Sequence, residues 1–343
     1  MQSDVDALQR IRTHPPLPPR PDGALKYKEA DLPKLKKDRF KKADLKKGRF
    51  RDLDEAPLPP GNWQSRPWEG GWHIDQGASS TAVLFLDIDA AGNVRDRMMR
   101  KQVYQSRREW ADATKWVGDV QDADKRIPVE VACLQDLRAI PRPVKLENRV
   151  NAVRLRDHHI YDRIFRYTMY LEYCPYGDLA DVIDMHGPRT GEKEGYKLIE
   201  GLTRQIPEPF LWRVFHSLAK LGVAMKLGRV EAATIPPKGW KEIIHRDLRL
   251  GNIFLDMATT DWFEVYPTPL LGDFGAAIRT HENDPLNPGI FQDQAEASGF
   301  VAPEQMAYVD YETFAPVDRF KLSAKTNVWS KSAIQLPDLY RNC

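Results

Sequence analysis

Three polar side chains stand on short loops that directly follow apolar runs, where the backbone would be held in place. Asp247 and Asn252 lie between Ile243-Ile244 and Ile253-Phe254-Leu255, two runs that predict short strands pinning a rigid turn. Asp273 follows another apolar run and precedes Phe-Gly. A carboxylate at such a place is often only a turn residue. Two carboxylates and an amide on fixed loops are nevertheless residue types that could accept a proton or hold a cation.

Three tripeptides occur in a fixed order along this part of the chain. They are His245-Arg246-Asp247, with Asn252 five residues after the aspartate, then Asp273-Phe274-Gly275, then Ala302-Pro303-Glu304. Each tripeptide alone is a weak signal. In this order and spacing they resemble the protein kinase family, of the eukaryotic serine/threonine type, over roughly residues 72 to 332. The alternative, unrelated loops of another α/β domain, would require a remote coincidence.

The resemblance implies a reaction and a role for each residue. Kinases transfer the γ-phosphate of Mg-ATP to a protein hydroxyl, mainly by positioning groups and stabilising charge. By its motif match, Asp247 would accept a hydrogen bond from the substrate hydroxyl and take its proton late in the reaction. Asn252 and Asp273 would hold Mg²⁺, which prefers oxygen ligands. Arg249 stands where such kinases usually carry a lysine near the γ-phosphate, and it keeps the charge with a different geometry.

The resemblance also implies that ATP binds residues earlier in the chain. Of the three glycines expected in the loop that covers the phosphates, Asp75 to Ala82, only Gly77 remains. Lys101 would hold the α- and β-phosphates. Strand alternation puts Met99 and Lys101 on one face and Arg100 on the other. A basic pair that is simply solvated remains the alternative.

Two further elements would complete the nucleotide site. Glu130 falls on the apolar face of a helix expected to begin at Pro128, where an isolated carboxylate would be costly to bury. The resemblance supplies Lys101 as its ion-pair partner, and an exposed Glu130 is the alternative. Leu171, Glu172 and Cys174 would form the hinge that holds adenine, with Leu171 lining the pocket.

The fold implied by the resemblance is a two-lobed α+β structure. A small antiparallel β N-lobe with one main helix would span residues 63–173, and a mainly helical C-lobe, truncated, would span 174–343. Alternating apolar residues between Trp72 and Val103 predict a pair of β-hairpins, and two more strands are expected around 153–160 and 164–173.

A long amphipathic helix is predicted after Pro207. Its apolar stripe would comprise Leu211, Val214, Phe215, Leu218, Gly222 and Met225. We assign this stripe to the core and give it no chemistry. Asp178 is expected to cap an earlier helix.

Departures from the family pattern favour a second hypothesis, a pseudokinase or truncated kinase-like protein that acts as a non-catalytic binding module. The glycine loop is reduced, Ala297 replaces an expected threonine, and Asn327 replaces the aspartate that would brace the catalytic loop. Thr280 and Ser298 are the hydroxyl candidates for regulatory phosphorylation between Gly275 and Ala302. A shortened C-lobe would leave apolar surface uncovered, which predicts poor stability or a partner.

Residues 1–62 form a separate region, a basic arm that contains several prolines. Between Lys26 and Arg51 the chain carries twelve Lys or Arg against four Asp or Glu. This composition predicts a disordered or partly helical arm. The arm could contact a polyanion or a nuclear import receptor, and the alternative is a solvated charged arm with no fixed partner.

Composition favours a globular protein in a reducing environment. The chain has 343 residues, 42% of them hydrophobic, and a net charge of only +2. Its three cysteines are odd in number and widely spaced, which argues against a disulfide framework or a zinc site. Neither a signal peptide nor a membrane-spanning run is expected, so we expect an intracellular protein, cytoplasmic or nuclear, with protein substrates.

Overall fold

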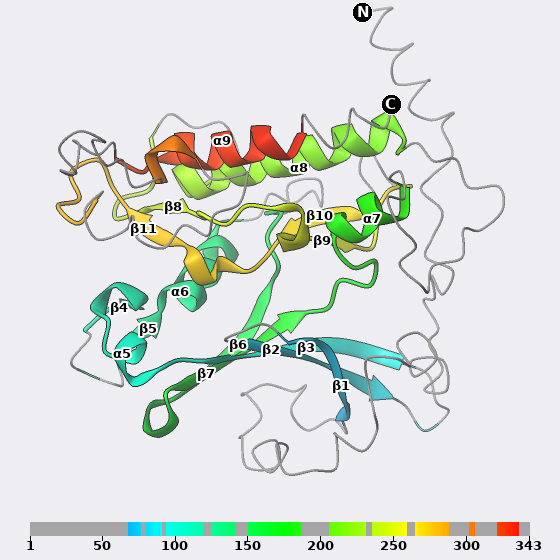
Figure 1. Ribbon diagram of the computed structural model, residues 1–343, viewed down its shortest axis with the longest axis horizontal. Coiled ribbons are helices and arrows are strands. Elements are labelled where there is room, and N and C mark those ends of the chain that lie inside the picture. Colours follow the sequence, from blue (N-terminus) through cyan, green and yellow to red (C-terminus); the bar gives the residue numbers. More distant parts are fainter. Residues whose placement is uncertain are drawn as a thin grey trace, which may run out of the picture. The chain divides into compact units, whose positions relative to one another are not determined.

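The computed structural model describes the chain from Trp68 to Gln335, with gaps. The described residues are 68–76, 80–88, 90, 94–119, 122, 125–141, 150–186, 206–230, 235–258, 265–287, 302–305 and 321–335. Their elements form a mixed α+β structure with antiparallel sheets (Figure 1). Two compact units can be separated. Unit 1 holds the described parts of Pro128–Val153 and Cys174–Cys343, and unit 2 holds those of Arg20–Ile127 and Arg154–Tyr173.

Unit 2 is built on a five-stranded antiparallel sheet. Its strands are β1 (Trp68–Gln76), β2 (Ser80–Ile88), β3 (Val94–Tyr104), β6 (Leu155–Tyr161) and β7 (Arg166–Glu172). They lie side by side in the order β1-β2-β3-β7-β6. The hairpins predicted from the alternation of apolar residues are therefore confirmed, and so are the two later strands. The predicted arm, residues 1–62, lies outside the described residues.

The pairing of β3 with β7 assigns each side chain of these strands to a face of the sheet, because directly paired residues point to the same side. On one side, which we call the Lys101 face, lie Met99, Lys101, Met169 and Leu171. On the other side, which we call the Arg100 face, lie Arg100, Gln102, Tyr104, Arg166, Thr168 and Tyr170. Met169 is fully buried, so the Lys101 face includes part of the unit's apolar core.

After β3 the chain makes an excursion that the sequence patterns did not predict. It contains α5 (Arg107–Trp110), a 3₁₀ turn, and β4 (Trp116–Val117) paired with β5 (Ile127–Pro128). The rings of Trp110 and Trp116 meet edge to face with centroids 4.7 Å apart. The Arg126 guanidinium lies 4.2 Å from the centroid of Trp116 and pairs with Asp162. Cation–π contacts and this ion pair therefore hold the excursion onto the β6–β7 hairpin.

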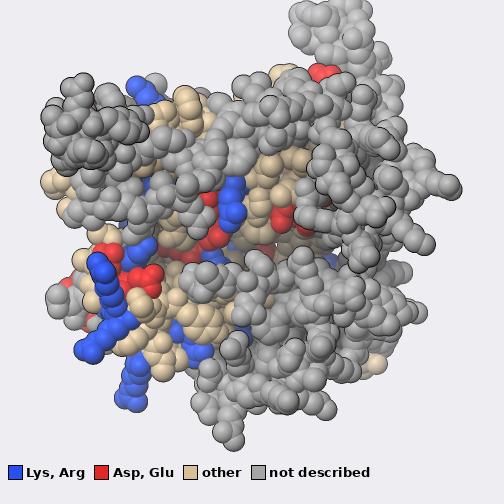
Figure 2. Space-filling view, viewed as in Figure 1, with Lys and Arg blue, Asp and Glu red and all other residues tan. Residues whose placement is uncertain are grey.

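Charged side chains of both signs lie on the surface drawn in Figure 2, and blue Lys and Arg side chains project at the lower left, where Figure 1 places α5 and β4. Arg107 and Arg108 on α5 are exposed. None of the helices in the described part of the chain is both long enough and apolar enough to cross a membrane.

Unit 1 contains four described α-helices and two two-stranded sheets. The helices are α6 (Val129–Ala139), α7 (Leu179–His186), α8 (Glu208–Leu227) and α9 (Ala324–Gln335). The sheets pair β8 (Glu242–Ile244) with β11 (Ile278–Thr280) and β9 (Ile253–Asp256) with β10 (Thr268–Leu271). Helix α8 packs against β8, β10 and α9, whereas α6 packs against β11 and the turn Phe274–Ala276. The lobe boundaries 63–173 and 174–343 remain predictions.

Helix α8 begins where predicted, but its buried stripe is rotated from the predicted one. Phe215 is 38% exposed and packs edge to face on Trp212, at a centroid distance of 5.9 Å. Val214, Leu218 and Met225 of the predicted stripe are buried as expected, and they are joined by Phe210, Leu221 and Ala224. Two aromatic residues thus shield each other on the outer side of the helix, which is why the apolar pattern alone placed the stripe wrongly.

Candidate functional site

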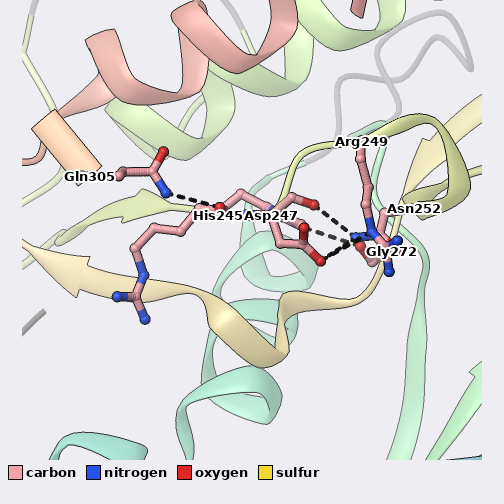
Figure 3. A network of polar contacts seen from close by, with 7 residues as sticks. His245, Asp247, Arg249, Asn252, Gly272 and Gln305 are labelled. Atoms are coloured by element: carbon pink, nitrogen blue, oxygen red, sulfur yellow. Dashed lines mark hydrogen bonds and ion pairs between the residues drawn. The ribbon is translucent and has the colours of Figure 1, made fainter. Parts of the chain in front are cut away.

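Asp247 and Asn252 are joined by two hydrogen bonds across the loop between β8 and β9 (Figure 3). The Asn252 side-chain amide donates to the Asp247 backbone oxygen at 2.7 Å and to the Asp247 carboxylate at 2.9 Å. Asn252 is only 3% exposed. Because both acceptors lie on the nitrogen side of this amide, its oxygen is the atom left to meet a cation.

Arg249 forms an ion pair with the same carboxylate of Asp247. Its Nε is 3.3 Å from Asp247 Oδ2, and its side chain is 46% exposed compared with 20% for Asp247. The loop thus brings together the three residues for which sequence analysis predicted catalytic roles, Asp247, Arg249 and Asn252. The roles themselves remain predictions.

His245 locks this loop to the next one. Its Nε2 lies 3.1 Å from the Gly272 carbonyl oxygen, which can only accept, so Nε2 carries the proton. Its Nδ1 accepts from the Asp247 backbone N–H at 3.3 Å. The ring is fully buried and packs edge to face on Phe274. A neutral imidazole with its proton on Nε2 satisfies both contacts.

Arg246 connects the loop to two later segments of the chain, at Ala276 and Gln305. Its Nε donates to the Ala276 carbonyl oxygen at 2.6 Å, and its own carbonyl accepts from the Gln305 side chain at 3.0 Å. Burial lowers the pKa of Arg246 to about 10, which leaves it charged near neutral pH. These contacts give His245 and Arg246 structural roles, because both side chains bind backbone groups of neighbouring segments.

Asn327 on α9 supports β8 through its side-chain amide, a role that the sequence did not predict for an asparagine. Its side-chain oxygen accepts from the His245 backbone N–H at 2.9 Å, and its nitrogen donates to the Ile243 carbonyl at 2.8 Å. The amide therefore pairs with the strand as another peptide group would. On the same helix, the Thr326 hydroxyl donates to the Glu304 carboxylate at 2.6 Å.

Asp273 begins the turn that follows β10, with a left-handed backbone (φ 58°). The two loops are tied together here, because the Gly272 N–H donates to the Asn252 carbonyl at 2.9 Å. A Cβ placed on Gly275 would lie 3.3 Å from an Asp273 carboxylate oxygen and 3.7 Å from a Glu130 carboxylate oxygen. Two carboxylates of unit 1, one from the loop and one from α6, therefore face the same small space.

The residues predicted to bind ATP are distributed over both units. Lys101 and Leu171 share the Lys101 face of unit 2, while the Glu172 carboxylate accepts from the Arg154 backbone N–H at 2.7 Å. Glu130 and Cys174 belong to unit 1. Gly77 lies outside the described residues. The predicted ion pair between Lys101 and Glu130 joins different units and stays a prediction.

The chemistry of the donor set fits Mg²⁺. Among the described residues there is no group of three or more His, Cys, Asp or Glu side chains that could hold a metal ion. Mg²⁺ does not require one, since it commonly binds one or two protein oxygens and completes its shell with water and phosphate. The Asn252 amide oxygen and the Asp273 carboxylate, on loops joined by a backbone hydrogen bond, are oxygens of this kind, and their role as ligands remains a prediction.

One predicted regulatory hydroxyl is inaccessible. Thr280 lies in β11, is 1% exposed and donates to the Asp284 carboxylate at 3.0 Å. Its hydroxyl is thus a structural group in this state. Ser298 lies outside the described residues.

The supporting residues that the sequence did not predict are Gln305 and Asn327, which reach the loop from distant parts of the chain. Only Asn327 carries a signal in the sequence, as a departure from the kinase pattern, and that departure predicts a weaker site. No protein-family model matches this chain, and none of the curated proteins matches it either.

Proposed function

We propose that the chain is a protein kinase-like phosphotransferase with a two-lobed fold, which transfers the γ-phosphate of Mg-ATP to a serine or threonine hydroxyl of a protein. The network of Asp247, Arg249 and Asn252 carries this proposal, together with the backbone bond that joins it to the Asp273 loop. Phosphoryl transfer depends on groups held in place before the substrate arrives, and here Asp247 and Asn252 are held by their mutual hydrogen bonds.

Each residue has a defined task in this proposal. One carboxylate oxygen of Asp247 contacts both Asn252 and Arg249. The other oxygen would accept a hydrogen bond from the substrate hydroxyl and then take its proton. Arg249, half exposed, supplies positive charge for the transferred phosphate. Bound Mg²⁺ would neutralise charge on the phosphate oxygens, with Asn252 and Asp273 as its protein ligands.

Phosphate transfer can be tested with radiolabelled ATP and a mixture of serine- and threonine-containing peptides. We expect Asp273→Ala and Asp247→Asn to reduce transfer to background while the protein stays folded. Glu282→Ala, which removes an exposed carboxylate of unit 1, is the matched control and should leave transfer unchanged. Equal turnover in the Asp273→Ala protein would refute the metal assignment.

The second candidate, a non-catalytic binding module, is favoured by the single glycine of the loop around Gly77 and by Asp75, whose charge would repel phosphate. Thermal unfolding with ATP, Mg²⁺ or both separates the two candidates. A ligand at a hundredfold excess over its dissociation constant stabilises the folded state by about 2.7 kcal/mol. A midpoint raised only by ATP and Mg²⁺ together supports the phosphotransferase, and a midpoint indifferent to both supports the binding module.

A further inference from the structure

The Arg100 face of the unit 2 sheet is polar and basic, yet all the side chains named on it are buried except Tyr104, which is 43% exposed. Arg100 is 5% exposed, Arg166 7%, Gln102 5% and Thr168 1%. This face is opposite to the one that carries Lys101, so it has no part in the proposed phosphotransfer. A charged side chain is costly to bury unless it meets an opposite charge, which makes its contacts informative.

Arg100 and its neighbours leave hydrogen-bond donors unused. Arg100 donates from Nη2 to the Gln102 side-chain oxygen at 3.2 Å, and the Tyr104 hydroxyl donates to the same oxygen at 3.1 Å. Its guanidinium also lies 5.5 Å from the centroid of Phe85. Within the described part of the chain, the Arg100 Nε and the Thr168 hydroxyl are both buried without a hydrogen-bond partner. The pairing of Gln102 with Thr168 places these two groups on the same side of neighbouring strands.

Three of the carboxylates described in unit 2 pair with other arginines. Asp87 pairs with Arg95, Asp96 with Arg156, and Asp162 with Arg126. Asp157, which occupies the same row of the sheet as Arg100, accepts from the His158 backbone N–H at 2.7 Å. Arg100 is therefore a buried guanidinium whose described contacts are an amide oxygen and a ring, neither of which carries a negative charge.

Arg166 adds a second positive charge near Arg100. Burial is the main cause that lowers the pKa of Arg100; Tyr170, Tyr104 and Tyr161 act against it, and the charge of Arg166 acts with it. Arg166 itself lies between aromatic rings, 5.8 Å from the centroid of Tyr104 and 5.1 Å from that of Tyr161. Burial raises the pKa of Tyr170 to about 12, so its hydroxyl keeps its proton at neutral pH. Apart from Asp157 and the Gln102 oxygen, the groups gathered here are cations and potential donors, which are complementary to an anion with several acceptor oxygens.

We propose that the Arg100 face is a binding site for an oxyanion, a phosphate group or a carboxylate, held by the guanidinium of Arg100 and the hydroxyl of Thr168. A planar guanidinium suits such ligands because its N–H groups can bind two oxygens side by side. The oxyanion can come from a free small molecule or from the chain itself. Asp52, Asp54 and Glu55 precede β1 by 13 to 16 residues, and 13 extended residues span up to about 45 Å.

The test is thermal unfolding of the full chain in increasing inorganic phosphate, with chloride at matched ionic strength as the reference. Phosphate raises the midpoint of the unmodified protein if the site takes a free oxyanion. Arg100→Met should then weaken the response at least about tenfold, because a charge-assisted pair of hydrogen bonds is lost. Arg107→Met, at an exposed arginine of the same unit, should leave the response unchanged.

Basal stability is not the readout, because replacing a buried charge with an apolar side chain can itself stabilise a protein. Should Arg100→Met not fold, Thr168→Val removes one donor at nearly constant volume and should also weaken the phosphate response. If both variants respond to phosphate as strongly as the unmodified protein does, the proposal is overturned. Phosphate would then bind elsewhere, for example at the nucleotide site.

A separate experiment tests whether the oxyanion comes from the chain's own carboxylates. If the chain's own carboxylates occupy the site, the unmodified protein shows no phosphate response. The triple variant Asp52→Asn, Asp54→Asn, Glu55→Gln should then unfold at a lower temperature and gain a phosphate response that depends on Arg100. If neither protein responds to phosphate, no oxyanion binds the Arg100 face and the proposal is wrong.

Discussion

Replacing Asn327 with aspartate should destabilise the protein, even though the kinase resemblance predicts an aspartate at this position. The amide of Asn327 accepts from the His245 N–H and donates to the Ile243 carbonyl, and the residue is 5% exposed. An aspartate keeps the first bond but turns a carboxylate oxygen toward the carbonyl of Ile243. One hydrogen bond worth about 1 kcal/mol is lost, and an unsatisfied buried carbonyl costs about 1–3 kcal/mol more. We expect a loss of about 2–4 kcal/mol in the free energy of unfolding at pH 7.

The loss should depend on pH with a defined sign. Burial and the facing carbonyl raise the pKa of the introduced carboxyl above its unfolded value. A neutral carboxyl can donate to Ile243, so the Asn327→Asp protein should approach the unmodified one at low pH and lose stability as pH rises through the raised pKa. Urea unfolding followed by circular dichroism at pH 7 and at pH 4.5 measures both values.

A matched pair of variants isolates the contact. Val328 is the next residue of α9 and is 58% exposed, so Val328→Asn and Val328→Asp should differ from each other by less than about 0.5 kcal/mol. If Asn327→Asp is as stable as the unmodified chain at pH 7, the Ile243 carbonyl does not depend on this amide and the reasoning fails.

Three further predictions concern other parts of unit 1. Gly228→Ala should lower the free energy of unfolding by about 2 kcal/mol or more, because the φ angle of Gly228 is +62° and a Cβ there would lie 2.5 Å from the ring of Trp240. Unchanged stability of the variant in urea would contradict this. Burial raises the pKa of the Cys133 thiol, so iodoacetamide at pH 8 should label the half-buried Cys174 in the native protein but Cys133 only after unfolding, as mass spectrometry of the peptides can show. Burial also raises the pKa of Glu242, because it disfavours the charged form of the carboxyl group. Glu242→Gln keeps an acceptor for the first N–H of α9 and removes the buried charge, so it should increase stability at pH values above that raised pKa. A lower melting temperature of the variant at pH 8 would argue against this.

The strands that frame the candidate site could be predicted because their signal is local. Apolar runs before Asp247 and before Asp273 correspond to β8 and β10, and alternation placed Lys101 and Arg100 on opposite faces of β3. What alternation could not indicate is how deeply Arg100 is buried, because burial depends on what packs against the strand and not on the strand itself.

Long-range contacts were harder to predict for the same reason. Nothing near residue 327 in the sequence shows that its amide will meet a strand more than eighty residues earlier. The excursion after β3 did carry a local signal, since Ser106 and Glu109 have the spacing of a capping box, and the structure contains both of its hydrogen bonds. The ring contacts of Arg126 had no such signal.

The tryptophan pair of that excursion gives unit 2 an optical signature. Two indole rings whose centroids are 4.7 Å apart, inclined at 80°, are close enough to share an absorbed photon, and such coupling splits their circular-dichroism band into lobes of opposite sign. Trp110 and Trp116 are 4% and 6% exposed, so the couplet reports a packed interior and not a surface contact. Its amplitude would follow the integrity of unit 2 in a solution of the whole protein, with no label attached to the chain.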